Sequence, residues 1–441
     1  MNTSRCVSGR HEVVSRRKFV AIAATTFLGP NIITSKALGA DGATPASERL
    51  TLGFIGMGNQ MGGHVGTFLG RDTCQVVAVC DVESRRLEQY KTRVNETYAQ
   101  KSGQGSYKGC DAYKDYRELL VREDIDAVVI ATPEHWHALQ VVDAANAGKD
   151  IYCEKPLSHT IREARAMATA VRRNAVVFQT GSQQRSERGF RVACELVRNG
   201  RIGKVHTVHV NVGGPPVDCY LPAQTTPETL DWDMWLGPAP YRSYNEDIAP
   251  PMEYEGWPNW RAYRDYSGGQ MCDWGAHHFD IAQWGLGMDE SGPVEIYPPD
   301  ATHERLTYVY ANGVVMQHGG GAGGKAGVEF IGDAGRVMVN RGYLETDPAH
   351  LVNELPGPNE IRLYESDNHA DNWLECIRTR SKPICDVEVG ARSISVCHLG
   401  NIAYELKQPL KWDPAKEQFV GDEEANRKLS RSMRSRWTLR A

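Results

Sequence analysis

From Leu50 onward, short apolar runs alternate with stretches whose apolar residues recur at helical spacing. The apolar runs are residues 52–55, 76–80, 126–131, 150–153 and 176–179. Parallel strands joined by crossover helices produce such an alternation, because each strand is buried on both faces and each helix on one. The sequence therefore predicts an α/β fold that begins with a doubly wound parallel sheet over residues 50–178.

A glycine-rich turn follows the first predicted strand. Gly56 allows a tight turn, and Gly58 lets the backbone approach a pyrophosphate at the N-terminus of the next helix. The third glycine of the usual dinucleotide fingerprint is displaced, since Met61 occupies its place and Gly62 comes one residue later. The turn by itself is a weak signal, but its position between a strand and a helix favours a Rossmann dinucleotide-binding domain.

An acidic residue, Asp81, ends the second predicted strand. Such a carboxylate can accept hydrogen bonds from both ribose hydroxyls and repels a 2′-phosphate, so NAD is favoured over NADP. Arg85 and Arg86 soften this preference, because a guanidinium can pair with that phosphate or stack on adenine. NADP therefore stays open as a cofactor. The structural alternative for Asp81 is a residue that only starts the following helix.

Two further predicted strands end in polar loops, at residues 132–137 and 154–156. Ligands of doubly wound sheets bind at the carboxyl ends of the strands, so Thr132 and Pro133 are expected to edge the nicotinamide. His137 either lines this site or has a structural role. His135 and His137 have no obvious third ligand in the sequence, so no metal site is predicted.

Lys155 follows the fourth of these strands and is expected to point into a cleft between two domains. An ammonium group there can orient a reacting hydroxyl and stabilise a developing alkoxide. The alternative is an ordinary surface lysine after a strand.

A predicted helix over residues 268–280 carries Asp273, His277 and Asp280 at the spacing i, i+4, i+7, which places them on one helical face. A carboxylate beside an imidazole fixes its tautomer and raises its basicity, so His277 is the predicted general base and Asp273 its brace. The alternative for His277 is a hydrogen-bonded histidine inside a packing layer. Asp280 is expected to be structural, and the role of His278 is open.

Four motifs occur in order along the chain: Gly-x-Gly at Gly56, Thr-Pro-x-His at Thr132, Glu-Lys-Pro at Glu154 and Asp-x-Gly-x-His-x-x-Asp at Asp273. Together they resemble the Gfo/Idh/MocA oxidoreductases over most of the chain. The resemblance implies a second α/β domain with an open, largely antiparallel sheet. It also implies pairing of subunits through the free face of that sheet, and hence a homo-dimer or homo-tetramer.

The motifs and the resemblance together define a predicted site. The predicted catalytic residues are Lys155, Asp273 and His277. The predicted cofactor contacts are Gly56, Gly58, Asn59, Gln60, Met61, Asp81, Arg86, Thr132, Pro133, His137, Glu154 and Lys155. The predicted substrate contacts are Gln184, Trp260 and His278. By resemblance, Glu154 contacts the nicotinamide ribose.

The second predicted domain covers residues 179–366, with antiparallel strands at 307–310, 314–317, 328–331 and 336–339. Residues 367–441 are expected to form helices and a basic arm that pack back on both domains. An insert at residues 213–267 is rich in tryptophan and tyrosine, which suit the apolar faces of a sugar. The same aromatic residues can equally form core or subunit contacts.

The N-terminus contains Arg16 and Arg17, followed by a weakly apolar run at 21–28 and small residues at 37–39. This pattern resembles a twin-arginine translocation signal over residues 1–39, which implies export of the folded protein to the periplasm, with a tether if the signal is not cleaved. The alternative is a basic, disordered N-terminus. No other segment has the ~20 apolar residues of a membrane span.

Composition narrows the function further. The 50 basic and 55 acidic residues are scattered, so no basic surface for nucleic acid is expected. The 11 cysteines have no regular spacing, which argues against a disulfide framework. An exported enzyme has no dependable pool of free NAD, so the nicotinamide is expected to be held tightly and recycled on the enzyme.

The predicted function is hydride transfer between the carbinol of a sugar, polyol or glycoside and this nicotinamide. The alternative is an NAD-dependent glycoside hydrolase or lyase that oxidises the sugar transiently. A third reading is a non-catalytic sugar sensor, which the intact Lys155, Asp273 and His277 disfavour.

Overall fold

The first sheet has six parallel strands in the order β3-β2-β1-β4-β5-β6. Its strands are β1 (Leu50–Ile55), β2 (Cys74–Cys80), β3 (Asp111–Tyr113), β4 (Ala127–Ile130), β5 (Asp150–Cys153) and β6 (Phe178–Thr180). The chain moves outward from β1 in one direction to β3 and then in the other to β6. The strand order therefore reverses between β1 and β4, which confirms the predicted doubly wound sheet and marks where a ligand would bind.

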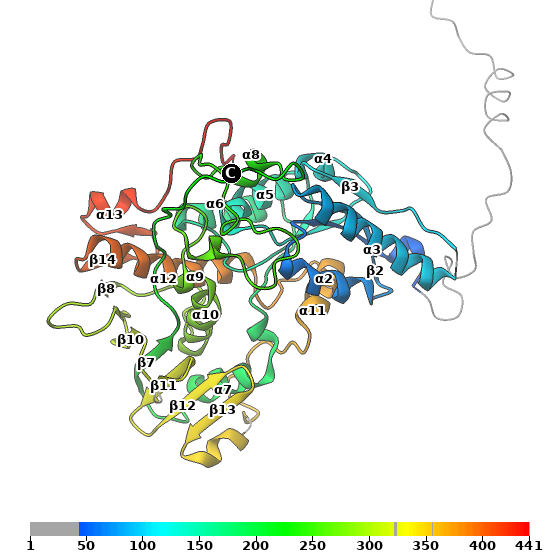
Figure 1. Cartoon of the computed structure of the whole chain (residues 1–441). Coiled ribbons are helices and arrows are strands. Elements are labelled where there is room, and N and C mark those ends of the chain that lie inside the picture. The colour runs from blue at the N-terminus through cyan, green and yellow to red at the C-terminus, as the bar shows by residue number, and fades with distance from the viewer. Residues whose placement is uncertain (1–43, 104, 322–323, 355, 441) are drawn as a thin grey trace, which may run out of the picture. The chain divides into compact units, whose positions relative to one another are not determined.

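Helices cover both faces of this sheet: α2 (Asn59–Leu69), α3 (Ser84–Ser102), α4 (Tyr116–Leu120), α5 (Glu134–Asn146) and α6 (Ile161–Arg173). A sixth helix, α11 (His369–Thr379), comes from much later in the chain and lies beside α2 (Figure 1). Its Trp373 packs edge-on against Phe68 of α2, with ring centroids 5.8 Å apart, and joins the cluster that contains Phe54 of β1. The C-terminal part of the chain thus helps to bury the first sheet.

The second sheet has nine strands in the order β13-β12-β11-β7-β10-β9-β8-β14-β15. They are β7 (Val205–Asn211), β8 (Glu295–Tyr297), β9 (Thr307–Val309), β10 (Val315–His318), β11 (Gly327–Gly332), β12 (Gly335–Asn340), β13 (Tyr343–Asp347), β14 (Leu410–Asp413) and β15 (Gln418–Phe419). Every adjacent pair is antiparallel except β7 with β10. This confirms the largely antiparallel sheet of the second α/β half.

Helices pack on this second sheet as well, chiefly α7 (Arg188–Arg198) and α10 (Gly275–Leu286) (Figure 1). The long helix α12 (Val387–Leu406) packs on α10 and on α6. Shorter elements are η3 (Ala46–Glu48), η4 (Gln183–Ser186), α8 (Trp232–Leu236), η5 (Asn259–Ala262), α9 (Gln270–Asp273), η7 (Ala349–Asn353) and α13 (Glu423–Arg427).

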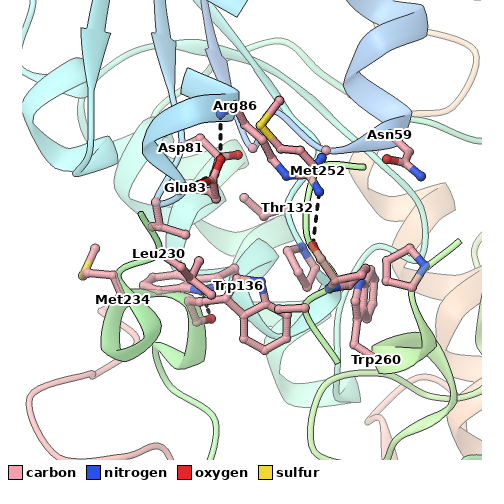
Figure 2. Close-up of a pocket in the computed structure, with 18 of the residues that line it drawn as sticks. Asn59, Asp81, Glu83, Arg86, Thr132, Trp136, Leu230, Met234, Met252 and Trp260 are labelled. Carbon is pink, nitrogen blue, oxygen red and sulfur yellow. Dashed lines mark hydrogen bonds between the residues drawn. The ribbon is translucent and has the colours of Figure 1, made fainter. Parts of the chain in front are cut away.

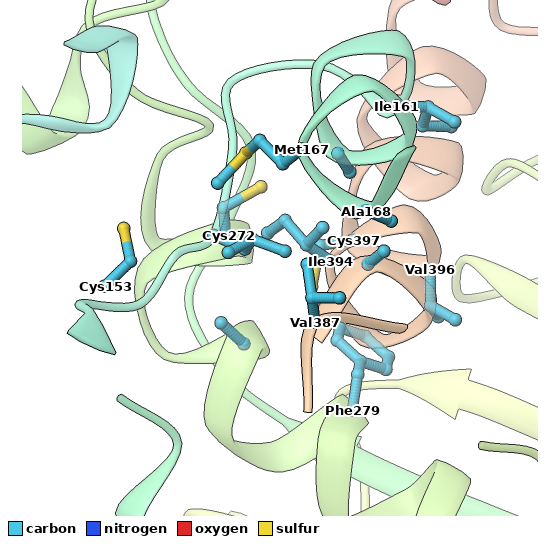
Figure 3. Close-up of a cluster of buried hydrophobic side chains, with 14 of the residues drawn as sticks. Cys153, Ile161, Met167, Ala168, Cys272, Phe279, Val387, Ile394, Val396 and Cys397 are labelled. Carbon is cyan, nitrogen blue, oxygen red and sulfur yellow. The ribbon is translucent and has the colours of Figure 1, made fainter. Parts of the chain in front are cut away.

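One hydrophobic core joins the two halves. Figure 3 shows Met167 of α6, Phe279 of α10 and Ile394 of α12 packed together. The same cluster includes Val128 of β4 and Phe330 of β11, so it extends from one sheet to the other. Helix α12 is buried on most of its surface, because both halves of the chain pack around it. This packing holds the polar groups between the two sheets in fixed positions relative to one another.

The computed structural model describes residues 44–440 apart from 104, 322–323 and 355. The predicted twin-arginine signal lies outside these residues. Leu50–Ala441 form one compact unit, to which both sheets belong. Of the helices that the structure describes, none is both long and apolar enough to cross a membrane. The ten cysteines it describes are free thiols, and nine of them are buried.

Candidate functional site

The glycine turn lies at the point where the strand order reverses. Gly56 has φ +88°, and a Cβ there would lie 2.8 Å from the backbone nitrogen of Thr132, so glycine is required. Gly58 is the N-cap of α2, and a Cβ on it would meet nothing within 4 Å. The first turn of α2 has no side-chain cap, so its backbone N–H groups remain to bind the pyrophosphate of a dinucleotide.

Asp81 directly follows β2, beside this turn. Its Oδ2 accepts a hydrogen bond from Met57 N at 2.5 Å, and its Oδ1 accepts one from Glu83 N at 2.8 Å. Burial raises the pKa of Asp81 and outweighs the lowering effect of these two backbone bonds. Each carboxylate oxygen has a further lone pair, so Asp81 can accept ribose hydroxyls while it braces the turn. The alternative reading of Asp81 as the residue that starts the next helix is wrong, because α3 begins at Ser84 and Glu83 is its N-cap.

A pocket lies between the carboxyl ends of these strands and the insert (Figure 2). Eight of the predicted cofactor residues line it: Gly56, Gly58, Asn59, Gln60, Asp81, Arg86, Thr132 and Pro133. Trp260, predicted to contact substrate, lines the same pocket from the insert side. The turn, the acid and the pocket together make the first half of the chain suitable for a nicotinamide dinucleotide.

Four of the twelve predicted cofactor residues do not line this pocket: Met61, His137, Glu154 and Lys155. Met61 is fully buried in the cluster that contains Phe54, so its side chain faces the core and only its backbone N–H faces the helix N-terminus. The two ring nitrogens of His137 each lie 2.8 Å from a carbonyl oxygen, one of Pro156 and one of Thr132. Burial lowers the pKa of His137, and the ring ties together the two loops that follow β4 and β5.

Glu154 lies buried behind the turn. Its Oε1 accepts hydrogen bonds from Gln60 Nε2 at 2.9 Å and from His64 Nε2 at 2.7 Å. Burial raises the pKa of Glu154, but the hydrogen bond and charge of His64, the charge of Lys155 and the hydrogen bond from Gln60 together hold the pKa below its usual range. His64 was not predicted as a site residue. Its spacing of i+4 from Gln60 on the same helix is the signal that could have found it.

Lys155 and Asp273 meet, although 118 residues separate them in the sequence. Lys155 Nζ donates to Asp273 Oδ1 at 2.7 Å and to the Asp273 carbonyl oxygen at 3.1 Å. Arg261, on η5 of the insert, forms an ion pair with the other carboxylate oxygen. Burial raises the pKa of Asp273, but the charges of Lys155 and Arg261 outweigh it and the pKa is lowered. No local sequence pattern indicated Arg261.

The predicted helix over residues 268–280 is divided into α9 and α10, with Trp274 between them. The structure differs from the expected brace: the Asp273 carboxylate is bound by Lys155 and Arg261, whereas His277 Nε2 accepts a hydrogen bond from Arg341 Nη2 at 3.0 Å. Burial, and then the charges of Lys155 and Arg341, hold the pKa of His277 well below its usual value. The imidazole is therefore neutral near pH 7, with its Nε2 lone pair facing Arg341.

Several polar atoms around His277 have no hydrogen-bond partner among the described residues. They are His277 Nδ1, both ring nitrogens of His278, and Oε1 and Nε2 of Gln184. His278 stacks on Trp274 at 5.9 Å between centroids, and burial lowers its pKa to about 4. Gln184 lies on η4, which packs against α10. A buried polar group without a partner costs about 1–3 kcal/mol, so these atoms mark where a hydroxyl-rich ligand would supply partners.

Asp280 has a structural environment, as the sequence suggested. It is fully buried and accepts hydrogen bonds from Arg185 Nε at 2.8 Å and from Ser393 Oγ at 2.6 Å. Within the part of the chain that the structure describes, no three His, Cys, Asp or Glu side chains lie close enough together to hold a metal ion.

The sheet order, the glycine turn and the acid after β2 define a nucleotide-binding α/β protein with a second α/β half. Residues 50–182 match the family model described as "Oxidoreductase family, NAD-binding Rossmann fold", and residues 217–439 match "Oxidoreductase family, C-terminal alpha/beta domain". The chain therefore belongs to the Gfo/Idh/MocA oxidoreductase family, and its cofactor domain is of the NAD-binding type.

Similar curated proteins match part of the chain. The myo-inositol 2-dehydrogenase of Thermotoga maritima is 30% identical over 172 residues, which cover 38% of this chain and 48% of that protein. A glycosyl hydrolase family 109 protein of Shewanella pealeana is 31% identical over 164 residues, which cover 36% of this chain and 34% of that protein. The chain thus spans less than half the length of these curated relatives.

Similar solved structures cover more of the chain at lower identity. The WlbA dehydrogenase of Bordetella pertussis, in complex with NADH and UDP-GlcNAcA, has a TM-score of 0.57 and 18% identity over 83% of this chain and 99% of that chain. The aldose-aldose oxidoreductase of Caulobacter crescentus, complexed with glycerol, has a TM-score of 0.55 and 18% identity over 82% and 99%. These similarities support the fold.

Proposed function

We propose that the protein transfers hydride between the carbinol of a sugar, polyol or glycoside and a tightly held nicotinamide. The observation that carries this proposal is the meeting of Lys155, from the nucleotide half, with Asp273, which lies four residues before His277 in the other half. His277, His278 and Gln184 have buried polar atoms without hydrogen-bond partners among the described residues. The hydroxyl groups of a bound substrate would supply these partners. The similarity to an inositol dehydrogenase over 172 residues is consistent with such a substrate.

Lys155 can contact a substrate oxygen without leaving Asp273. An ammonium group has three donors, and Asp273 accepts two hydrogen bonds from it. The third donor is free to bind the reacting hydroxyl and to stabilise negative charge as it develops on that oxygen. Because Asp273 also binds Arg261, its position is fixed from two sides, and Lys155 is held in place with it.

His277 can accept the hydroxyl proton at Nε2. This nitrogen accepts a hydrogen bond from Arg341, which shows that it carries the lone pair when Nδ1 carries the proton. Arg341 is exposed, so a substrate hydroxyl can replace it. NAD, when bound, takes up or returns the hydride. The lowered pKa of His277 keeps the imidazole in its proton-accepting form at neutral pH.

Export and oligomer formation belong to the same proposal. We infer from the Arg16 and Arg17 leader that the protein is carried to the periplasm with its cofactor, where the nicotinamide is recycled on the enzyme. A homo-dimer or homo-tetramer is the assembly that the family resemblance favours. The second candidate function is an NAD-dependent glycoside hydrolase or lyase, which the similarity to a family 109 protein supports.

The test is hydride transfer by the freshly purified protein. Nucleotide released by denaturation is identified by mass spectrometry, and the native protein is then given single sugars, pairs of a sugar with a ketose, and aryl glycosides. Reduction of bound nicotinamide by a sugar and its reoxidation by a second sugar supports the main proposal. Release of the aryl group without net reduced nicotinamide favours the glycosidase. Full turnover in both His277→Ala and Lys155→Ala would overturn the site.

A further inference from the structure

The insert at residues 213–267 does not lie apart from the nucleotide pocket. Its backbone pairs with the segment that directly follows Asp81: Ser84 N donates to Thr229 O at 2.9 Å, and Asp231 N donates to Val82 O at 3.0 Å. Glu83 and Leu230 form an antiparallel bridge between these bonds. The insert is therefore attached beside the acid that would hold the adenosine ribose.

A second set of contacts joins the insert to α3 and α2. Arg85 and Arg86 lie in the first turn of α3, where Arg85 donates to the carboxylate of Glu253 at 2.9 and 3.3 Å and Arg86 Nη2 donates to the carbonyl oxygen of Pro250 at 3.4 Å. Asn59, the first residue of α2, donates to the carbonyl oxygen of Gly256. The segment 250–256 thus bridges from the first turn of α3 to the N-terminus of α2, where a pyrophosphate would lie.

The insert also supplies apolar walls to the pocket. Leu230, Met234, Met252 and Trp260 lie around the space that Asp81, Arg86 and Thr132 border from the other side (Figure 2). Of these, Leu230 and Trp260 pack against the small aromatic core of Trp232, Tyr244 and Tyr266. This part of the wall is therefore preorganised.

The contacts of the insert with the nucleotide half differ in burial. Some are buried: Ser267 Oγ donates to Glu134 Oε1 at 2.7 Å, and Trp136 Nε1 donates to the carbonyl oxygen of Trp235 at 3.0 Å. Those of the segment around Glu253, which lies between Trp235 and Ser267, are exposed, with 47% of the Arg85 side chain and 69% of the Glu253 side chain accessible. The buried contacts on both sides can act as anchors while the exposed segment opens.

We propose that residues 250–256 form a strap that closes over the nucleotide from within the same chain and must open before the cofactor can be exchanged. This inference rests on the proposed function, since it takes a nicotinamide dinucleotide as the occupant of the pocket. The strap supplies a physical reason for retention: a dinucleotide below it cannot leave along the strand ends without breaking the contacts of Arg85, Arg86 and Asn59. High salt weakens the Arg85–Glu253 pair and accelerates exchange.

The experiment measures nucleotide exchange, separately from turnover. Protein loaded with isotope-labelled NAD is mixed with unlabelled NAD to follow release, and protein stripped of nucleotide is mixed with labelled NAD to follow association, both by mass spectrometry. One variant replaces residues 250–256 by a glycine-serine segment of equal length, and a second is Glu253→Ala. The matched control is Glu246→Ala, an exposed acid of the same insert whose side chain lies outside the pocket. Thermal unfolding of each variant confirms that it is folded.

A strap slows entry and exit alike, whereas a simple contact slows exit alone. The replaced segment is therefore expected to raise both the association and the release rate, each by roughly 100-fold, because a closed lid must open first. Glu253→Ala is expected to speed release about 2- to 5-fold, as for an exposed ion pair, and Glu246→Ala to change nothing.

Faster release with an unchanged association rate would show that the segment only contacts the nucleotide, and would overturn the strap. Wild-type rates in the replaced variant would overturn it too. Failure of every form of the protein, wild type included, to bind NAD would instead overturn the proposed function.

Discussion

The two ends of the candidate site are built differently. At the nucleotide end, the two carboxylates that follow strands of the first sheet are bound by neighbours, Asp81 by the backbone of Met57 and Glu83 and Glu154 by the side chains of Gln60 and His64. At the proton-handling end, Lys155 and Asp273 come from distant parts of the chain, and His277, His278 and Gln184 keep polar atoms without partners. A satisfied, strapped pocket suits a group that stays bound. An unsatisfied cluster suits a ligand that comes and goes.

The largest expected effect comes from replacing His277, which should impair the proton-handling end and leave the nucleotide end intact. We expect His277→Ala to lower turnover by about 10²- to 10⁴-fold, the usual contribution of a general base, and to leave bound nucleotide unchanged. Steady-state kinetics with nucleotide content measured on the same sample tests this. His206→Ala, an exposed histidine of β7, is the control and should retain full activity. Loss of nucleotide in proportion to activity would show that the two ends are not separate.

Lys155→Ala is expected to lower turnover by about 10²- to 10³-fold, because one preorganised donor to the developing oxyanion is removed. Asp273 then keeps only Arg261 as a cationic partner. Lys155→Arg should restore little, since a guanidinium does not reproduce the position of a compact ammonium. The exposed Lys411 of β14 gives the matched control. An equal loss in Lys411→Ala would mean that the effect is not local to the site.

The same contrast explains how much the sequence could predict. Strands β1, β2, β4 and β5 are continuous apolar runs bounded by turns, so local pattern was sufficient for the first sheet. The edge strand β3 was missed because it is short and has no fully buried residue. Strand β13 was missed for the same reason. Edge strands lack the apolar pattern that burial imposes on central ones.

Within the site, the success of prediction depended on distance along the chain. Lys155 and Asp273 were predicted because each belongs to a recognisable motif, and the structure brings them together. Arg261 and Arg341 were missed, since one lies in the insert and the other in the turn between β12 and β13, where no periodicity indicates a role. The predicted contact of Asp273 with His277 was wrong, because the Asp273 carboxylate is bound by Lys155 and Arg261 instead.

At the nucleotide end, Asp81→Ala is expected to weaken NAD binding by roughly tenfold or more, the worth of one charged hydrogen bond at about 1.5–3 kcal/mol. NADP binding should weaken less or improve, because the repulsion of a 2′-phosphate is removed and Arg86 remains. Titration with both nucleotides measures the ratio. Asp72→Ala, an exposed acid before β2, controls for a general change of charge. An unchanged ratio would show that Asp81 braces the glycine turn through Met57 without binding the ribose.

The smallest effect concerns the pH dependence of the proton-handling end. Burial and the charges of Lys155 and Arg341 lower the pKa of His277, so kcat/KM should fall only as the pH drops below 6.5 through this lowered value, where the imidazole becomes protonated. Arg341→Ala removes one of these charges, and the acid limb should move upward. Burial and the charge of Lys155 lower the pKa of His277 more than Arg341 does, so most of the lowering should remain in this variant. Arg341→Lys keeps the charge and should leave the limb in place. A limb that does not move in Arg341→Ala would assign the acid-side group to a residue other than His277, whereas a uniform loss at every pH would show that Arg341 acts on substrate binding alone.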